Sequence, residues 1–508
     1  MIFRRSVFLV LVMTGLGTLA VPAQPPNILL IVSEDNGPEL GCYGDPYART
    51  PHLDQLADEG VRFAYAFVPF SVCSPSRAAF LTGLHPHQNG QIGLATHKFS
   101  MYREDTPNVA TILQPAGYRT GLIGKLHVNP ERAFPFDFRG IPEANFSRAQ
   151  PASAYMKAAQ SFWSEAEDAP WFLSVNFPDA HLPFTPQSGG SPAVLQTGDD
   201  VSPLPWVGAD SPRLREVTAN YYNCMARLDD WVGMLLAELD KSGQADNTLV
   251  IYFGDHGAQF VRGKGSVHEA GLKIPLIVRW PGHSEPGQVR DELTTTLDIV
   301  PTLVAATGVP APPHVTGRAL QPLLRGETPE SWREYVFALT TGSFPRACVV
   351  QHAVRDNRYR LISSPLPGTY NLDAGSYLDP DHWHFVISGL LPEERRAVSP
   401  QMEAAYRRWE RPPRYELYDL ENDPWELTNL AESADHQDIK ARMVSALEDW
   451  QIRTRDPFSD QRMVDDYVAE QLSQLENEYR QDEHFRWEHI DNFHAWRDAR
   501  GAGIKTKR

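Results

Sequence analysis

Four mostly apolar runs recur along the first half of the chain, at residues 27–33, 118–123, 171–177 and 248–253, and the first of them is continuous. Such runs are typical of strands in a parallel sheet that is covered on both faces. Residues 214–239 carry apolar side chains at helical spacing and predict a long amphipathic helix. Shorter helices are predicted after Thr50-Pro51, over 108–113 and over 297–307, and a further strand over 274–280. This alternation predicts an α/β fold.

Each of the four runs is followed closely by ionisable side chains. In chain order these are Glu34 and Asp35, Lys125 and His127, Asp179 and His181, and Asp255 and His256. Taken singly, each could be a solvated loop residue or a satisfied core histidine. Because ligands of open α/β sheets bind outside the carboxyl ends of the strands, four such endings favour one shared cleft.

Residues 71–83 read Ser-Val-Cys-Ser-Pro-Ser-Arg-Ala-Ala-Phe-Leu-Thr-Gly. Pro75 suits the first turn of a helix and Gly83 suits its end, so Cys73 is predicted just before a short helix. The N–H groups and dipole there favour an anion, and the planar fork of Arg77 suits a tetrahedral oxyanion. A buried structural cysteine is the alternative. A nucleophile beside an anion site indicates sulfuryl or phosphoryl transfer.

The pattern changes after about residue 335. Short strand-like runs at 335–339, 348–354, 359–363 and 415–418 predict a smaller antiparallel sheet, and residues 439–450 predict a helix. The charged tail from about residue 465 reads as a surface helix or a partly disordered segment. We therefore expect a catalytic domain over 24–335, an α+β subdomain over 336–455 and a charged C-terminal extension over 456–508.

Composition and the first residues bear on location and partners. The net charge of −17 makes nucleic acid an unsuitable partner, and a polyanionic substrate would need a local basic pocket. Residues 1–23 read as a signal peptide, with Arg4 and Arg5 before an apolar stretch and cleavage after Ala23. An exported protein, periplasmic or secreted, without a stable membrane anchor is expected.

The chain has four cysteines. If Cys73 is modified, three remain, so at most one disulfide can form.

The ionisable groups also indicate a chemistry. Glu34, Asp35, Asp255 and His256 are mostly hard donors that suit Ca²⁺ or Mg²⁺. Further positive charge comes from Arg77, Lys125 and Lys264. His127 and His181 are natural proton-transfer groups, and Lys125 or His181 could protonate a leaving group. The residues alone thus predict a metal-assisted hydrolase of a sulfate or phosphate derivative.

Several motifs carry a family resemblance: Cys73-Ser-Pro-Ser-Arg77, Leu81-Thr-Gly-Leu84, His87-Gln-Asn-Gly90, Gly121-Leu-Ile-Gly-Lys125 with His127, Phe134-Pro-Phe-Asp-Phe138, and Glu416-Leu-Tyr-Asp419 with Asp423-Pro424. With them the chain resembles the type I, formylglycine-dependent sulfatases of the alkaline-phosphatase superfamily, and within these the heparan N-sulfatases (N-sulfoglucosamine sulfohydrolases). The resemblance implies an alkaline-phosphatase-like sandwich. A large mixed, mostly parallel sheet would lie between helices, beside a smaller C-terminal antiparallel-sheet subdomain.

The resemblance also implies a mechanism. A maturation enzyme that generates formylglycine would oxidise Cys73, and the product would bind one Ca²⁺ with Glu34, Asp35, Asp255 and His256. Its hydrate would attack sulfur while Arg77 and Lys125 hold the nucleophile and the sulfate oxygens. His181 and Lys264 would contact the sulfate or leaving group, and His127 would remove the proton that expels sulfate. The implied substrate is a sulfated glycan, namely the N-sulfate of glucosamine in heparin or heparan sulfate.

Three positions depart from the family pattern. Glu34 stands where sulfatases usually carry Asp, His256 replaces the Asn of the N-sulfatases, and Lys264 stands where those enzymes carry Arg. The last change removes a bidentate contact to sulfate. His97 and Lys98 could reach a sugar, but a solvated loop is the preferred interpretation.

Three other functions stay open. One is an O-sulfatase that acts on another sulfated polysaccharide. A phosphatase or phosphodiesterase of the same superfamily would use Ser or Thr as nucleophile and His-rich zinc ligands, which Cys73 and the acidic cluster argue against. A non-catalytic glycan-binding protein would keep Cys73 unmodified.

Overall fold

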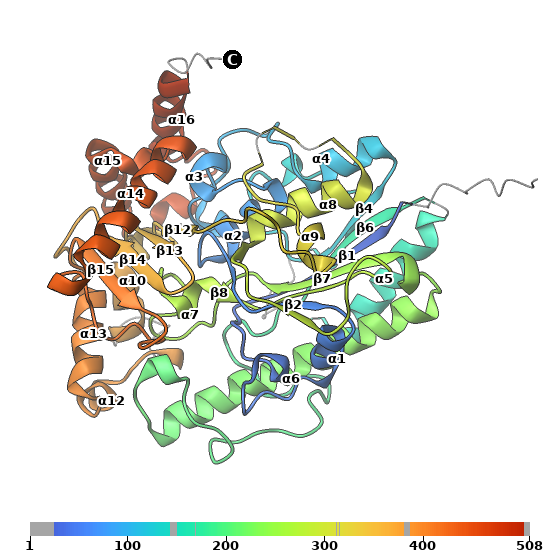
Figure 1. The fold of residues 1–508 in the computed structure, drawn as a ribbon, viewed down its shortest axis with the longest axis horizontal. Coiled ribbons are helices and arrows are strands. Elements are labelled where there is room, and N and C mark those ends of the chain that lie inside the picture. Colours follow the sequence, from blue (N-terminus) through green and yellow to red (C-terminus); the bar gives the residue numbers. More distant parts are fainter. Residues whose placement is uncertain are drawn as a thin grey trace, which may run out of the picture.

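A computed structural model describes residues 25–142, 150–167, 169–310, 312–313, 315–379 and 387–501 (Figure 1). The predicted signal peptide over residues 1–23 lies outside these ranges. Within them, no helix combines the length and apolar character that crossing a membrane requires. All four cysteines are described and are unpaired thiols.

The largest sheet has eight strands in the order β10-β2-β9-β7-β1-β6-β4-β5. Their bounds are β1 (Asn27–Ser33), β2 (Val61–Phe63), β4 (Arg119–Gly124), β5 (Phe138–Gly140), β6 (Trp171–Asn176), β7 (Thr248–Gly254), β9 (Leu276–Arg279) and β10 (Gln288–Arg290). β7, β1, β6, β4 and β5 pair in parallel, and β9 is antiparallel to both its neighbours. The four predicted apolar strands are confirmed as the centre of a mostly parallel sheet.

Helices cover both faces of this sheet (Figure 1). On one side lie α1 (Pro51–Asp58), α5 (Ala152–Ala166) and α6 (Pro212–Lys241); on the other lie α2 (Cys73–Thr82), α3 (Pro86–Asn89), α4 (Val109–Leu113), α8 (Ile299–Thr307) and α9 (Gln321–Leu324). Alternate residues of β1 enter the two cores: Leu29 and Ile31 join the α6 side, and Ile28 and Leu30 join the α2 side. A strand buried on both faces reads as a continuous apolar run because neither face meets water.

The strand predicted over 274–280 is split in two. β8 (Lys273–Ile274) joins β3 (Ala66–Phe67) and β11 (Thr294–Thr295) in a three-stranded sheet, whereas β9 enters the large sheet. Pro275 separates them, because proline has no N–H to donate within a continuous ladder. The short helix α7 (Glu269–Leu272) precedes β8.

The predicted second sheet is confirmed as four antiparallel strands in sequence order. They are β12 (Val336–Thr340), β13 (Gln351–Arg355), β14 (Tyr359–Ser363) and β15 (Tyr415–Asp419). Between β14 and β15 come α10 (Leu372–Leu378), α12 (Pro392–Arg396) and α13 (Pro400–Glu410). Tyr377 of α10 and Tyr406 of α13 belong to the same core as α6. This connection therefore packs against the larger sheet's helices rather than only within the predicted subdomain.

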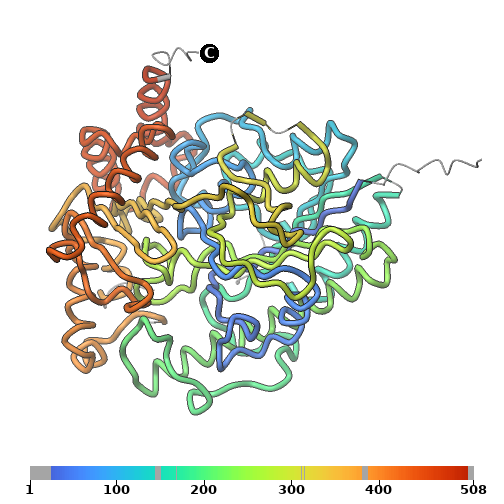
Figure 2. Tube along the Cα trace, in the orientation of Figure 1, coloured from blue at the N-terminus to red at the C-terminus, as the bar shows by residue number. Residues whose placement is uncertain are grey.

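The last part of the chain contains α14 (Gln437–Thr454), α15 (Gln461–Leu472) and α16 (Glu488–Gly501). A cluster of buried aromatic side chains fills the space between them and the small sheet: Trp450, Phe458, Tyr467, Tyr479, Trp487, Phe493 and Trp496. As Figure 2 shows, this red segment lies beside the early, light-blue part of the chain. Of the two interpretations of this tail, the surface helix fits the described residues, since α15 and α16 are helices with exposed outer faces and packed inner faces, and disorder does not.

Candidate active site

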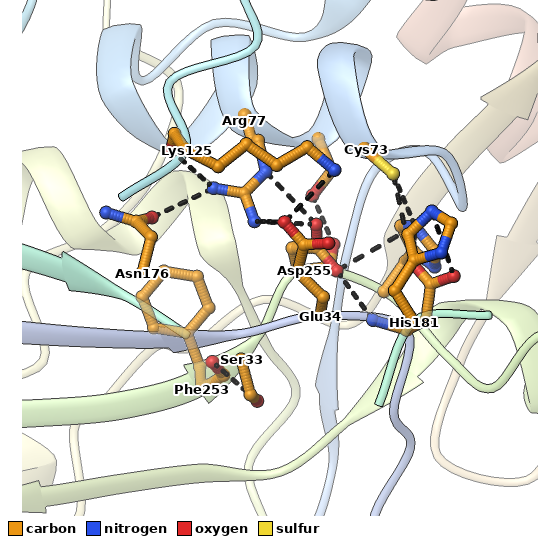
Figure 3. Close-up of polar contacts among 12 residues, drawn as sticks. Ser33, Glu34, Cys73, Arg77, Lys125, Asn176, His181, Phe253 and Asp255 are labelled. Atoms are coloured by element: carbon orange, nitrogen blue, oxygen red, sulfur yellow. Dashed lines mark hydrogen bonds and ion pairs between the residues drawn. The ribbon is translucent and has the colours of Figure 1, made fainter. Parts of the chain in front are cut away.

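The ends of β4, β6, β1 and β7 meet at one edge of the large sheet, where α2 begins. In the parallel register, Ser33 pairs with Gly254 and Gly124 pairs with Asn176, so the residues that follow these strands come together. Figure 3 shows Glu34, Asp255, Lys125 and His181 converging around Cys73, which is the first residue of α2. The sequence predicted this shared edge correctly.

Four of the predicted metal ligands form one compact, fully buried cluster. Ligand atoms of Asp35, Cys73, Asp255 and His256 all lie within 4.8 Å of one another. The Cys73 Sγ is 3.4 Å from His256 Nε2 and 3.8 Å from Asp35 Oδ1. His256 Nδ1 faces the carbonyl oxygen of Gly257 at 3.0 Å, and a proton shared there leaves the Nε2 lone pair directed into the cluster. Two carboxylates and an imidazole nitrogen fit a hard divalent cation.

The backbone of Asp35 is unusual. Its φ of 50° lies in the left-handed region that non-glycine residues rarely adopt. Its amide donates to Asp255 Oδ1 at 3.0 Å, which links the ends of β1 and β7. A residue held in this conformation costs roughly 1 kcal/mol or more, and such positions concentrate at functional sites.

Glu34 lies beside this cluster rather than within it. Its Oε1 contacts Arg77 Nη2 at 3.1 Å and Lys125 Nζ at 3.0 Å. Its Oε2 is buried and has no hydrogen-bond partner among the described residues. Burial raises the pKa of Glu34 to about 7, although Lys125 and Arg77 oppose that rise. Because an unpartnered buried carboxylate oxygen is costly, this atom also fits a cation ligand.

Arg77 is fully buried, and its guanidinium serves the protein itself. It contacts Asp255 Oδ2 at 3.0 Å, Glu34 Oε1 at 3.1 Å, the carbonyl oxygen of Lys125 at 3.0 Å and Asn176 Oδ1 at 2.8 Å. The fork expected to face an oxyanion thus orients two carboxylates instead (Figure 3). Asn176, at the end of β6, had no signal in the sequence because it reads as part of an otherwise apolar strand.

Cations surround the Cys73 sulfur. Burial alone would raise the pKa of this thiol, but Lys125, Lys264 and His256 lower it well below its usual value. Lys264 Nζ lies 2.6 Å from Asp35 Oδ2 and 3.2 Å from His181 Nε2, so it joins the metal cluster to the imidazole. This pocket supplies the local positive charge that a sulfate would need in an otherwise acidic protein.

His127 is held by a backbone φ of 55°, immediately after the end of β4. Neither ring nitrogen has a hydrogen-bond partner among the described residues. Burial and Lys125 lower the pKa of His127 to about 4, against the opposing effect of Cys73. The ring is therefore a neutral base beside the position of the nucleophile.

One group that the strand endings predicted for the cleft has a structural role. Asp179 forms a double ion pair with Arg227 of α6, at 2.8 and 2.5 Å. Asp179 is buried and ion-paired, so neither the shared cleft nor a solvated loop describes this residue.

The loop at His97 and Lys98 is not solvated as predicted. His97 is buried, stacks on Phe344 at 4.7 Å between ring centroids, and its Nδ1 lies 2.5 Å from Tyr479 Oη. Trp487 donates to the carbonyl oxygen of His97 at 2.9 Å. These partners come from the end of the chain, nearly four hundred residues later, so no local pattern could have revealed them.

Comparisons with known proteins agree with this geometry. A family model described as Sulfatase matches residues 26–309. The chain belongs to the sulfatase family. A second model, N-sulphoglucosamine sulphohydrolase, C-terminal, matches residues 254–370. The sulfatase resemblance of the sequence is thereby confirmed, and the protein is a hydrolase with an alkaline-phosphatase-like fold.

Individual relatives cover most of this sulfatase. Human N-sulphoglucosamine sulphohydrolase is 31% identical over 499 residues, which cover 90% of this chain and 96% of the relative. An ulvan-active sulfatase of Formosa agariphila is 28% identical and covers 84% of this chain and 80% of its own length. A structure solved with its substrate D-glucosamine-2-N,6-O-disulfate superposes with a TM-score of 0.62 at 19% identity, over 85% of this chain and 99% of the other. That last likeness concerns the fold alone.

Proposed function

We propose that this sulfatase hydrolyses sulfate groups on a sulfated glycan, and that its substrate is the N-sulfate of glucosamine in heparin or heparan sulfate. The main support is the 31% identity to human N-sulphoglucosamine sulphohydrolase across 90% of this chain. The C-terminal model of that enzyme begins at residue 254 and ends at 370, so it includes Asp255, His256 and Lys264. The matched region therefore contains part of the candidate site.

The surroundings of Cys73 support the chemistry. A formylglycine made from Cys73 would supply a hydrated aldehyde as nucleophile, and a Ca²⁺ held by Glu34, Asp35, Asp255 and His256 would offset the negative charge of the sulfate. Lys125 and Lys264 stand next to the sulfur position and provide cations for the sulfate oxygens. Arg77 keeps the carboxylates of Glu34 and Asp255 in place.

The proton-transfer groups take two sides of the pocket. His181 Nε2 lies 3.2 Å from Lys264 Nζ, so the pair can deliver a proton to the leaving group. His127 is a neutral base beside Cys73 and can accept the proton of a hydroxyl formed at that position. We propose these as separate roles because Lys264 contacts His181 directly, whereas His127 lies next to Lys125.

An O-sulfatase is the second candidate, favoured by the similarity to the ulvan-active sulfatase. A substrate panel separates the two. Purified protein is incubated with N-sulfoglucosamine, N-acetylglucosamine 6-sulfate and an aryl phosphate, and released sulfate or phosphate is measured. We expect the highest kcat/KM on N-sulfoglucosamine. A preference for the 6-sulfate would establish the O-sulfatase, and a preference for phosphate would reject both.

The maturation and the metal need their own measurement. We propose that the chain is exported and that a formylglycine-generating enzyme modifies Cys73. Peptide mass spectrometry of protein from its native host should find an aldehyde at position 73, and intact cysteine throughout would contradict the mechanism. Treatment with a calcium chelator should lower both activity and Tm, since a bound ion stabilises only the folded state, and Ca²⁺ should restore both.

A further inference from the structure

Asp373 is a buried carboxylic acid at the start of α10, and its Oδ2 has no hydrogen-bond partner among the described residues. It is only 4% exposed. Its backbone amide bonds to Asn371 Oδ1 at 2.9 Å, but no donor among the described residues reaches its carboxyl group, and Oδ2 is sealed from solvent. Its nearest charged influence is Lys264. Burial raises the pKa of Asp373 to about 8, although Lys264 opposes that rise.

The carboxyl group lies against the segment that carries Lys264. A Cβ atom added to Gly265 would fall 2.3 Å from Asp373 Oδ1, so the acid occupies the space that a side chain would need. One turn later, Tyr377 donates to the carbonyl oxygen of Lys264 at 3.2 Å. α10 is therefore docked on the Lys264–Gly265 backbone, and Asp373 sits at the contact.

Lys264 connects this position to the reacting groups. Its ammonium group contacts Asp35 Oδ2, His181 Nε2 and, at 3.5 Å, Gln259 Oε1. Asp373 is thus close to Lys264, the cation that we expect to contact the sulfate or the leaving group. It comes from the connection between β14 and β15, outside the strand endings that form the rest of the site.

A buried acid without a donor is a cost that a folding sequence normally removes. Desolvating a polar group without a compensating hydrogen bond costs roughly 1–3 kcal/mol in proteins. Groups of this kind are retained where a ligand completes them.

We propose that Asp373 is a specificity-determining residue that receives a hydrogen bond from an N–H or O–H group of the sugar, next to the sulfate that is removed. This rests on the proposed function as a glycan sulfatase, and it assigns the recognition of the sugar, as opposed to the sulfate, to α10. A substrate without such donors, such as a simple aryl sulfate, makes no use of Asp373.

The test compares Asp373→Leu with wild type on two substrates, N-sulfoglucosamine and an aryl sulfate. Leucine has nearly the same shape and cannot accept a hydrogen bond, so kcat/KM for the sugar should fall roughly 10- to 100-fold more than for the aryl sulfate. The Tm of the variant should equal or exceed that of wild type, because an apolar side chain replaces a buried acid for which the described residues provide no donor. Glu393→Gln, an exposed acid of α12, is the matched control and should change neither quantity.

Other outcomes reject the proposal. Equal losses on both substrates would mean that Asp373 only positions Lys264. A fall in Tm with an unchanged substrate ratio would mean that it is a structural residue. If wild type prefers another sugar sulfate, the proposed N-sulfate specificity fails, but the same ratio is then measured with that sugar. Turnover of aryl sulfate without turnover of any sugar sulfate would overturn both proposals.

Discussion

The buried side chains at the edge of the large sheet and those in the C-terminal segment (residues 456–501) differ in chemistry and in how they are stabilised. At the sheet edge most buried groups are charged and are paired with opposite charges from other elements, as Arg77 of α2 holds Glu34 and Asp255. In the C-terminal segment most buried groups are aromatic, such as Tyr467, Trp487 and Phe493, although Asp456 is also buried and is paired with His352. The first arrangement positions charged groups for a reaction. The second stabilises, through apolar packing, the loop of residues 91–99 that it covers.

The two regions meet at more than one place. Ala95 donates to Ser74 Oγ at 2.9 Å, directly beside Cys73, and His97 two residues later is held by Tyr479 and Trp487. Tyr467 donates to the carbonyl oxygen of Thr341, and the neighbouring Thr340 donates to the carbonyl oxygen of Gly265, beside Lys264. Changes in the C-terminal segment should therefore reach the site through the loop of residues 91–99 and through the end of β12. Three substitutions test how far the two regions depend on each other.

The largest effect is expected at the sheet edge. Cys73→Ala removes the proposed nucleophile and should lower turnover by on the order of 10³-fold or more. The Tm should change by only a few degrees, because the side chain is small and its neighbours keep their partners. Activity equal to wild type would show that position 73 is not the nucleophile.

A smaller and different effect is expected from the C-terminal segment. Trp487 is fully buried, so Trp487→Ala should cost about 3–5 kcal/mol of local stability and increase proteolysis within residues 456–501. KM for the sugar sulfate should rise roughly tenfold, about 1.4 kcal/mol, with kcat on an aryl sulfate little changed. A loss of kcat as large as that of Cys73→Ala would contradict the separation of the two regions.

The smallest effect concerns the junction between the two sheets. Burial alone would raise the pKa of Glu269, but Arg355 of β13 and Arg360 of β14 lower it from 4.5 to about 2. The carboxylate therefore stabilises the fold at pH values above about 4.5, and this contribution of about 3 kcal/mol disappears as the pH falls toward 2. Glu269→Gln should lower the free energy of unfolding at pH 7 by this order.

The control for that prediction is the pH series itself. The stability difference between Glu269→Gln and wild type should shrink as the pH falls below 4.5, as measured by denaturant unfolding. A difference that stays constant across this range would mean that packing, and not the charge, explains the loss. Glu393→Gln should show no difference at any pH.

Much of the site could be predicted because a parallel sheet converts sequence order into spatial proximity. The acids after β1 and β7 meet because those strands pair directly, and the basic groups after β4 lie at the same edge of the sheet, across β6. The sequence could not show which groups the Arg77 guanidinium contacts, because that depends on the positions of the Glu34 and Asp255 carboxylates in the folded protein. It also could not give Asp373, which has no motif and arrives from a connection in the second sheet.

The prediction for the C-terminal segment left out its packing. Tyr467 of α15 and Ile490, Phe493 and Trp496 of α16 are buried at helical spacing, whereas Tyr479 and Trp487 come from the connection between these helices. Charged residues surround them in the sequence, so composition alone did not separate a packed surface helix from a disordered segment. Clustered tryptophan and tyrosine in a charged region were the available sign of burial.

All ten residues of α2 are buried, and the thiol that begins it is only 1% exposed. The folded protein therefore seals this thiol from any enzyme that would modify it. If position 73 carries the proposed aldehyde, the oxidation would have to take place on an unfolded chain, before the helix closes.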